Sequence, residues 1–308
     1  FRRLNTKISF LQRLTPTFIK RILILIFASI LLPLLITNVI KLELFVNGVF
    51  IGLIIALGAV GLSLIYGILK FANIAHGDLM TIAAYLTLFI LEVPFKNMGL
   101  TSTGLGPFTF GYPILLAIPI GIVITTGLVL ITELLIYSRL RNKQTNAVIT
   151  AMASLGMAIA IRGLLHIFWG GTTHQYPRLS KQFYLLPFDI RIPPDNLFVG
   201  AVSIIAIITL YWFLNQTKIG KAMRATSDNP SLAKVTGIPT EKIIIWTWII
   251  GGSLAATAGI LLAISQAQLY PVMGWKLLIP LFAAVVIGGI GNPYGALLGA
   301  LLMGITTE

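Results

Sequence analysis

Long apolar runs without charged residues are the feature that most constrains how this chain can fold. A helix needs about 20 apolar residues to cross the hydrocarbon core of a bilayer. The sequence contains long runs of this kind and two that are shorter or interrupted: the long runs are 20–40, 45–69, 113–138, 145–168, 196–214 and 243–266, and the others are 78–93 and 277–305. The sequence therefore predicts about eight membrane segments.

The composition indicates a membrane protein and excludes an ordinary soluble domain. Hydrophobic residues make up 57% of the 308 residues and charged residues only 10%, whereas soluble domains have about 25% charged residues. The two-residue alternation of a membrane β-barrel is absent, so the spans are expected to be helices. We therefore predict an all-α fold, a polytopic transmembrane helical bundle in which some segments are broken or re-entrant.

The net charge of +13 does not indicate a nucleic-acid partner, because the basic residues are divided among short loops between apolar runs. If the N-terminus is cytoplasmic and the segments alternate, 15 Lys and Arg residues fall on the cytoplasmic side, 6 fall outside, and Arg162 lies within a span. Cytoplasmic loops carry an excess of Lys and Arg, so this orientation is the predicted one. The absence of cysteine excludes disulfide and thiolate chemistry.

Residues 1–19 form a separate predicted segment. Their apolar side chains fall roughly on one helical face, with basic residues elsewhere, which is typical of an interfacial amphipathic helix. A solvated basic tail is the alternative. Residues 20–308 form the predicted transmembrane domain, and because the apolar pattern still continues near Glu308, we expect further membrane-spanning material beyond it.

The stretch FANIAHGDLM, residues 71–80, places polar residues between two apolar runs. Gly77 weakens a helix, and Asn73 and Asp78 are good cap residues, so the sequence predicts a break followed by a helix that begins inside the protein. Irregular backbone at membrane depth must be buried or line a cavity, and broken helices mark substrate pathways in transporters. The alternative is that His76 and Asp78 cap an interfacial turn and satisfy each other.

Residues 215–242, NQTKIGKAMRATSDNPSLAKVTGIPTEK, form a long basic connection between two spans. Asp228 or Asn229 before Pro230 is a suitable N-cap with proline at the first helical position. Gly237 is suited to follow a helix end. The pattern predicts a short helix, a turn and a second short helix in the cytoplasm. Docking of a cytoplasmic partner would explain so compact a loop, and a solvated connector is the alternative.

Several segments, in this order, resemble the permease subunits of ABC importers for branched-chain and neutral amino acids. They are NGVFIGLIIALGAVGLSLIYGILKFANIAHGDLM, TELLIYSRLRNKQTNAVITAMASLGMAI, GKAMRATSDNPSLAKVTGIPTEKI and AAVVIGGIGNPYGALLGALLMG. The resemblance covers roughly residues 45–308. It does not specify the substrate, because permeases for urea and other small amides share much of the pattern. The N-terminal tail and first span are longer than the minimal family pattern.

The resemblance implies roles for two groups of residues. The block that contains Asn73, His76, Gly77 and Asp78 would lie along the substrate pathway or its gate. The loop at 215–242 would be a coupling loop that fits a groove on an ATPase subunit. Its expected contact residues are Gly220, Arg224, Asp228, Asn229, Ala233 and Gly237.

The resemblance also implies partners and a location. The partners would be a second permease subunit, related but different, two ATPase subunits, a periplasmic substrate-binding protein and membrane lipids, in the bacterial inner (cytoplasmic) membrane. The chain has no G-x-x-x-x-G-K-[ST] loop, so ATP and Mg would be bound by the ATPase chains. This chain is expected to be a multi-pass transport subunit, not an enzyme, with no cofactor. No metal site is expected either, because there are only three histidines and nothing else converges on His76.

The expected function is import of neutral or branched-chain amino acids from the periplasmic binding protein to the cytoplasm. One alternative keeps the class and changes the cargo to urea or a short amide. Another is a proton-coupled secondary transporter that uses His76 and Asp78, which would have no need of a coupling loop. An intramembrane enzyme is disfavoured, because the sequence contains no recognisable nucleophile motif.

Small residues recur at every fourth position in two segments. Small residues at this spacing let helices approach closely, so both sets are expected to serve helix packing. The sets are Gly251, Ala255 and Gly259, and Gly291, Gly295 and Gly299.

Two charged residues, Glu133 and Arg162, lie within predicted spans, and one long loop follows the second of these spans. We expect Glu133 to form a structural pair with the nearby Arg139 or Arg141. Arg162 is expected to reach toward the outer interface or to bind a substrate carboxylate. The loop at 169–195 is expected to meet the outside partner, and an ordinary aromatic belt is the alternative.

Overall fold

The computed structural model of the chain describes residues 42–100, 105, 108–178, 184–186 and 190–308. The predicted interfacial helix at 1–19 and the predicted span at 20–40 lie outside these residues. The chain divides into two compact units, Phe1–Val46 and Asn47–Glu308. The helical bundle is the second unit.

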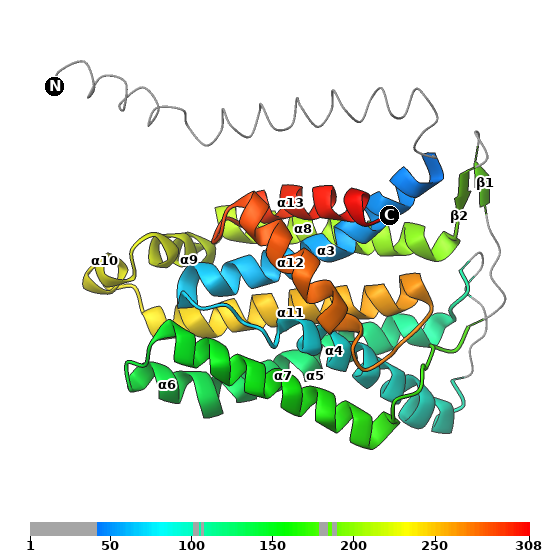
Figure 1. The fold of residues 1–308 in the computed structure, drawn as a ribbon, viewed down its shortest axis with the longest axis horizontal. Helices are drawn as coiled ribbons and strands as arrows, with labels where there is room; N and C mark the ends of the chain where they lie inside the picture. The colour runs from blue at the N-terminus through cyan, green and yellow to red at the C-terminus, as the bar shows by residue number, and fades with distance from the viewer. Residues whose placement is uncertain (1–41, 101–104, 106–107, 179–183, 187–189) are drawn as a thin grey trace, which may run out of the picture. The chain divides into compact units, whose positions relative to one another are not determined.

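Helices form almost all of the described structure (Figure 1). In chain order they are α3 (Leu42–Leu69), α4 (His76–Ile90) with its π-helical extension η1 (Leu91–Phe95), α5 (Tyr112–Thr132) with the extensions η2 (Glu133–Tyr137) and α6 (Ser138–Asn142), α7 (Ala147–Trp169), α8 (Pro194–Gln216), α9 (Lys218–Asp228), α10 (Pro230–Val235), α11 (Thr240–Gln266), α12 (Met273–Gly288) and α13 (Pro293–Thr307). Strands β1 (Tyr184–Leu186) and β2 (Ile190–Ile192) pair antiparallel in a hairpin that the sequence did not predict. Apart from this hairpin, the all-α prediction is confirmed.

The long helices match the predicted apolar segments. Within the described residues, six stretches are long and apolar enough to cross a membrane: Leu42–Leu69, His76–Phe95, Tyr112–Asn142, Ala147–Trp169, Pro194–Gln216 and Thr240–Gln266. The predicted segment 277–305 is two shorter apolar helices, α12 and α13, with a turn between them. The number of membrane segments and the cytoplasmic N-terminus stay predictions.

Helices α3 and α11 are the most deeply buried of the bundle. Of their most apolar 18-residue stretches, 78% and 83% is buried, against 22% for α7 and 28% for α8. A helix that is apolar on all sides belongs in a protein core or in a membrane. Helices α7 and α8 expose large apolar side chains, and a surface of this kind suits a bilayer or another membrane subunit.

Glycines allow the central helices to approach closely. A Cβ on Gly61 of α3 would lie 3.0 Å from the carbonyl oxygen of Gly251 in α11. Two turns later, a Cβ on Gly259 would overlap the backbone of Met80 in α4. Helix α11 is therefore in close backbone contact with both α3 and α4.

Helix α4 begins inside the bundle. After α3 ends at Leu69, the chain returns along the bundle through residues 70–75 before α4 starts at His76 (Figure 1). The His76 ring binds the carbonyl group of Gly58, eleven positions before Leu69, which is about 16 Å along a helix that rises about 1.5 Å per residue. The predicted break followed by an internal helix start is confirmed.

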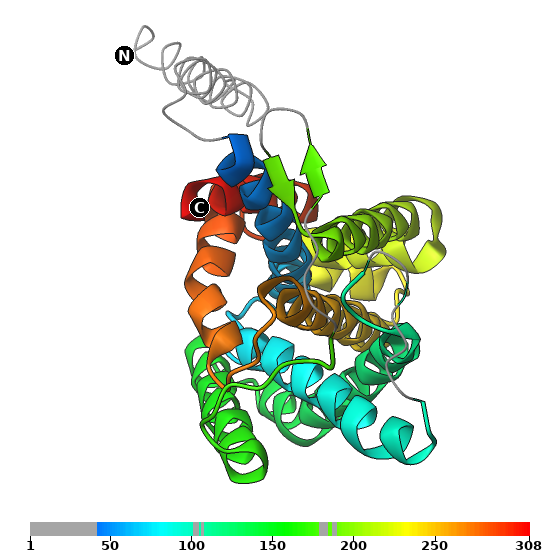
Figure 2. The same ribbon diagram turned by 90° about the vertical axis from the view of Figure 1, so that its right-hand side faces the viewer.

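Helix α12 also begins inside the bundle, against the start of α4. The Gly274 N–H group donates to Thr81 Oγ1 at 3.0 Å, and a Cβ on Gly77 would overlap the backbone of Gly274. Helix α12 ends near the turn where Gly291 lies against Gly67, in the last turns of α3. The two half-helices thus meet at their N-termini and then diverge (Figure 2, α12 in orange and α4 in cyan).

The two ends of the bundle carry different segments. The end that carries residues 215–242 and the last turn of α3 is called the loop end. The end that carries η1 and the start of α5 is called the opposite end.

Replacing Gly259 with Ala should destabilise the protein, because the added methyl group would overlap the Met80 carbonyl. Overpacking of this kind costs about 1–3 kcal/mol, so we expect the Tm in mild detergent to fall by about 5 °C. The control is Gly127→Ala in α5, where a Cβ meets nothing within 4 Å. It should leave the Tm unchanged or raise it slightly, and an equal Tm for both variants would contradict the close contact of α4 with α11.

Candidate functional site

An ion pair lies where the two half-helices meet. Asp78, in the first turn of α4, is fully buried. Arg162 of α7 donates from Nε to Asp78 Oδ1 at 3.1 Å and from Nη2 to Oδ2 at 3.0 Å. This two-point geometry is a strong form of Arg–carboxylate contact. The expectation that Arg162 reaches toward the outer interface is therefore wrong, because its side chain is held by a charge inside the span.

Trp275 joins this ion pair from the first turn of α12. Its ring centroid lies 4.4 Å from the guanidinium carbon of Arg162, within the range of a cation–π contact. Helices α4, α7 and α12 contact one another through the side chains of Asp78, Arg162 and Trp275. We call these three residues the junction. The role of Trp275 was not predicted from the sequence, where its position just after Pro271 and Gly274 was the available signal.

His76 lies in the same helical turn as Asp78 but binds elsewhere. Its Nε2 donates to the Gly58 carbonyl at 2.9 Å, and the ring is fully buried. Gly61 leaves room for the ring, because a Cβ there would lie 3.3 Å from His76 Cε1. Within the described residues no hydrogen bond joins His76 to Asp78, so the alternative in which they satisfy each other is wrong. His76 instead ties the start of α4 to α3.

Neither Asn73 nor Asp78 caps α4. The N-cap is Ala75, and no side chain accepts a hydrogen bond there. Asn73 is fully buried, and its side-chain amide has no hydrogen-bond partner among the described residues. The predicted cap roles are wrong because the capping rule considers only neighbours in sequence, whereas the partner of Asp78 is Arg162, 84 positions away.

Segment 70–75 is held in place by α7 and by the half-helix contact. Ser154 Oγ accepts a hydrogen bond from the Ile74 N–H group at 3.0 Å. Gly77 has no room for a side chain beside Gly274. His76, Gly77 and Asp78 therefore lie in the turn of α4 that contains the junction, and Asn73 lies buried in the segment that leads into it. Within the described residues, no group of three or more His, Asp or Glu side chains could hold a metal ion.

Residues 215–242 form two short helices with a turn between them, as the sequence predicts. Helix α9 begins at a sharp corner after α8. Thr217 caps it by accepting through Oγ1 from the Gly220 N–H group at 2.9 Å. Gly220 has no room for a side chain against the backbone of Leu214, so this corner fixes the direction of α9.

Helix α10 has the predicted ends. Asn229 accepts through Oδ1 from the Leu232 N–H group at 3.0 Å, and Pro230 follows it at the start of the helix. Gly237 lies just beyond the helix with a φ of +84°, a conformation that favours glycine. Ala233 is buried. The two predicted helix boundaries are confirmed.

Arg224 and Asp228 are exposed on α9. Arg224 donates from Nη1 to Asn215 Oδ1 at 3.1 Å. Both charged residues line a cavity of about 280 Å³ that also borders Gly67 of α3 and Tyr294 of α13. The loop end thus presents accessible charged groups beside the ends of two helices of the bundle.

Ser227 connects α9 to the end of α3. Its Oγ donates to the Gly67 carbonyl at 3.1 Å, and its own carbonyl accepts from Lys70 Nζ at 2.9 Å. Gly291, in the turn after α12, lies against the same Gly67. Helix α9 therefore contacts the point from which the chain leads into α4 and at which α12 ends.

A second buried acid lies at the loop end. Glu133 is only 2% exposed, and its Oε1 accepts from Arg141 Nη1 at 2.8 Å. Arg141 Nη2 donates in turn to Glu241 Oε2 at 2.8 Å. The predicted structural pair of Glu133 is confirmed with Arg141 as the partner, and it ties the extensions of α5 to α11.

The first predicted packing set contacts other helices of the same chain. Gly251 packs against α3, and Gly259 packs against α4. Ala255, between them, is fully buried. These contacts lie inside the chain and make the centre of the bundle compact.

The second set is divided between a turn and a helix. A Cβ on Gly299 would overlap Ala284, and a Cβ on Gly288 would overlap Gly295, so α12 and α13 are in backbone contact. Gly291 lies before α13, in the turn, with a φ of +78°. Its predicted place in a helical ridge is wrong, because a backbone break interrupts the four-residue spacing.

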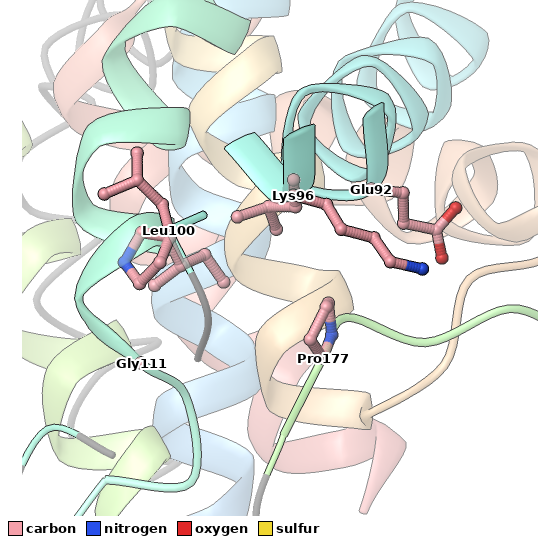
Figure 3. A pocket seen from close by; sticks show the side chains of 8 residues that line it. Glu92, Lys96, Leu100, Gly111 and Pro177 are labelled. Atoms are coloured by element: carbon pink, nitrogen blue, oxygen red, sulfur yellow. The ribbon is translucent and has the colours of Figure 1, made fainter. Parts of the chain in front are cut away.

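A cavity of about 320 Å³ opens at the opposite end (Figure 3). Glu92 of η1 and Lys96 just after it line the cavity together with Pro177 from the loop after α7 (Figure 3). Beside Pro177, the Tyr176 hydroxyl donates to the Ala84 carbonyl at 3.0 Å, and burial raises the pKa of Tyr176 above its ordinary value, which keeps this donor neutral. The loop after α7 is thus anchored on α4, and its contact with an outside partner stays a prediction.

The sequence profile of one protein family covers nearly all of the bundle. The family is described as "Branched-chain amino acid transport system / permease component", and its profile matches residues 44–308. The chain belongs to this family. The resemblance found in the sequence is confirmed, and the protein is a multi-pass membrane permease of the ABC-importer type.

Curated relatives agree with this assignment. The high-affinity branched-chain amino acid transport system permease protein LivH of Salmonella typhimurium is 28% identical over 84% of this permease and 82% of its own length. The corresponding protein BraD of Pseudomonas aeruginosa is 29% identical over 84% and 83%. The autoinducer 2 import system permease protein LsrC of Yersinia pseudotuberculosis is 31% identical over 51% and 44%. No solved structure matches the permease.

Replacing Arg141 with Met should strongly destabilise the permease. The change would leave Glu133 buried without its counter-charge, which costs about 3–5 kcal/mol. We therefore expect the Tm in detergent to fall by about 10 °C. The double variant Glu133→Gln/Arg141→Met should recover most of this loss.

The matched control is Arg139→Met. Arg139 is exposed in α6, and no ion pair of this residue occurs within the described part of the chain. Its variant should keep the Tm of the unmodified permease. If the Arg139 and Arg141 variants had the same Tm, the pair with Glu133 would contribute nothing to stability.

Proposed function

We propose that this permease imports branched-chain or other neutral amino acids, which a periplasmic binding protein delivers, into the cytoplasm of a bacterial cell. The family supports the class of importer. The cargo is supported by the names of LivH and BraD, both of which are branched-chain amino acid permeases. The partial match to an autoinducer 2 permease shows why similarity alone does not fix the cargo.

In this proposal the loop end faces the cytoplasm, because that side has the larger number of Lys and Arg residues. Two ATPase subunits bind ATP and Mg, and one of them docks on residues 215–242. Arg224 and Asp228 are exposed and would contact it directly. Gly220 and Ala233 are buried and would give α9 and α10 the required shape. A second, related permease chain would complete the pathway.

The observation that carries this proposal is the contact of Ser227 with both Gly67 and Lys70. A force applied to α9 would reach the end of α3 directly. It would then reach α4 through segment 70–75 and α12 through Gly291. Because packed helices move as bodies, both half-helices would shift, and the junction between their N-termini would change. Asn73, His76, Gly77 and Asp78 lie at the end of this route, as pathway or gate residues should.

The two alternatives receive less support. A proton-coupled transporter would use His76 and Asp78 as a relay, but the two side chains have separate partners, the Gly58 carbonyl and Arg162. Such a transporter also gives no reason for the two helices of residues 215–242. A urea or short-amide permease would share that loop, but the names of the relatives do not point to this cargo.

Replacing Arg224 and Gly237 with Glu should uncouple the importer. The two changes put negative charge and bulk on the proposed ATPase contact, so ATP-driven uptake of labelled isoleucine should fall at least tenfold. The amount of permease in the membrane should not change, and ATP hydrolysis by the complex should continue. Uptake into membrane vesicles and hydrolysis are measured on the same preparations.

Two controls separate docking from general damage. Arg139→Glu places the same charge reversal as Arg224→Glu on an exposed residue outside the loop, and it should leave uptake intact. Asparagine also tolerates positive φ, so Gly237→Asn should reduce uptake only slightly. Normal uptake by the Arg224/Gly237 variant would contradict the coupling role of residues 215–242.

A further inference from the structure

We propose that Arg162 binds the carboxylate of the transported amino acid at the junction, with Trp275 as an apolar wall beside it. This inference rests on the proposed function and deepens it, because it names the chemical group that the pathway recognises. It assigns the recognition to Arg162 and gives Asp78 the role of positioning the guanidinium group.

Arg162 has hydrogen-bonding capacity that Asp78 does not use. Asp78 takes Nε and Nη2. Nη1 has no acceptor among the described residues, although a guanidinium group has five N–H donors in a fixed fork. The Arg162 side chain is 22% exposed, whereas Asp78 is completely covered. Arg162 is therefore a partly accessible side chain within a membrane span, and one edge of its fork has no partner among the described residues.

An open guanidinium edge inside a span requires a polar partner. Charged side chains at membrane depth face a bundle interior or a water-filled cavity and mark substrate pathways. A carboxylate matches the planar fork better than any other group in a neutral amino acid. Urea and simple amides have no carboxylate, so this site would favour amino acids over the alternative cargo.

The two charges of the junction balance each other. Asp78 already neutralises Arg162, so a zwitterionic amino acid would meet no net charge there. An unpaired arginine would hold a carboxylate tightly, whereas a paired one would hold it weakly enough to release it. Helices α4 and α12 both begin at this point without a side-chain cap, and their positive N-terminal ends would add a modest attraction for the same anion.

An apolar surface lies beside the charges of the junction. Trp275 is 37% exposed. Ile159 precedes Arg162 by three positions and Ile279 follows Trp275 by four, so each lies on the same helical face as its neighbour. Both isoleucines are largely exposed, at 60% and 78%. An anion-binding edge flanked by aliphatic side chains suits a ligand with a carboxylate at one end and an aliphatic side chain at the other.

The test compares three forms of the complete transport complex. They are the unmodified permease, Asp78→Asn and the double variant Asp78→Asn/Arg162→Gln. Uptake of labelled isoleucine into proteoliposomes gives KM and kcat, with the same binding protein throughout. Equilibrium binding of isoleucine is measured on the purified complex without the binding protein, and the second permease chain is quantified in each preparation.

We expect Asp78→Asn to bind isoleucine more tightly and to have a lower kcat than the unmodified complex, because Arg162 remains but has lost its counter-charge. The double variant should bind isoleucine at least tenfold more weakly than the unmodified complex, and its KM should rise accordingly. If Arg162 served only to neutralise Asp78, removing both charges would restore normal transport, and this result would overturn the inference. Loss of the second permease chain from the double variant would also overturn it, by assigning Arg162 to the subunit contact.

Two further outcomes are decisive. If Asp78→Asn does not assemble, Arg162→Lys replaces it, because lysine keeps the charge next to Asp78 but lacks the fork. Its KM should rise at least tenfold, and an unchanged KM would overturn the inference. An unmodified complex that transports no amino acid would overturn the proposed function itself, whereas amino acid transport with no effect of Arg162 would overturn this inference alone.

Discussion

The ion pair between Asp78 and Arg162 is the interaction on which the centre of this bundle depends. An isolated charge within a span would cost about 2.5–3.5 kcal/mol on insertion scales, so each residue requires the other. The pair places α7 beside the start of α4, and Trp275 brings the start of α12 to the same point. Two helices that begin inside a membrane protein leave backbone N–H groups unpaired at their N-termini. The ion pair and the Gly274 contact to Thr81 lie at these N-termini.

Glycine makes the same arrangement possible in steric terms. Gly77 and Gly274 bring the two half-helices into backbone contact, and Gly61 leaves room for the His76 ring. The result is a bundle whose centre holds a break instead of a continuous helix. In the proposed mechanism this break is the part that moves, because segment 70–75 leads into α4 and the turn at Gly291 follows α12, and both connect to the last turns of α3.

The loop end supplies the attachment. Ser227 binds the backbone near the end of α3, and Gly291 packs on the same place from the turn after α12. A single displacement of α9 would therefore act on both half-helices at once. This geometry gives a physical reason for a structured loop where a short connection would otherwise suffice, and it explains why the proposed ATPase contact can lie far from the proposed pathway.

The sequence allowed the local features to be predicted. The apolar runs indicated the spans, and Asn229, Pro230 and Gly237 indicated the ends of α10, because span length and capping depend on neighbouring residues. The internal start of α4 followed from the polar residues around Gly77. The neighbourhood of Glu133 contained its partner Arg141, only 8 positions away.

Contacts between distant segments could not be predicted in the same way. Nothing local joins Asp78 to Arg162, so Asp78 was interpreted as a cap and Arg162 as a residue that reaches the interface. A charged residue in a membrane requires a partner of opposite charge, and this was the available signal. The requirement does not identify which acid is the partner of Arg162. Gly291 was misplaced for a related reason, since a spacing of four residues indicates a helical ridge only where the backbone is continuous.

The most direct test of the central claim is purification of the tagged permease in mild detergent, with mass spectrometry of the proteins that accompany it and ATP-dependent uptake after reconstitution. The account predicts two ATPase subunits and a second permease chain in a fixed ratio, and uptake that requires ATP. A permease that purifies alone and transports amino acids without ATP would contradict the account.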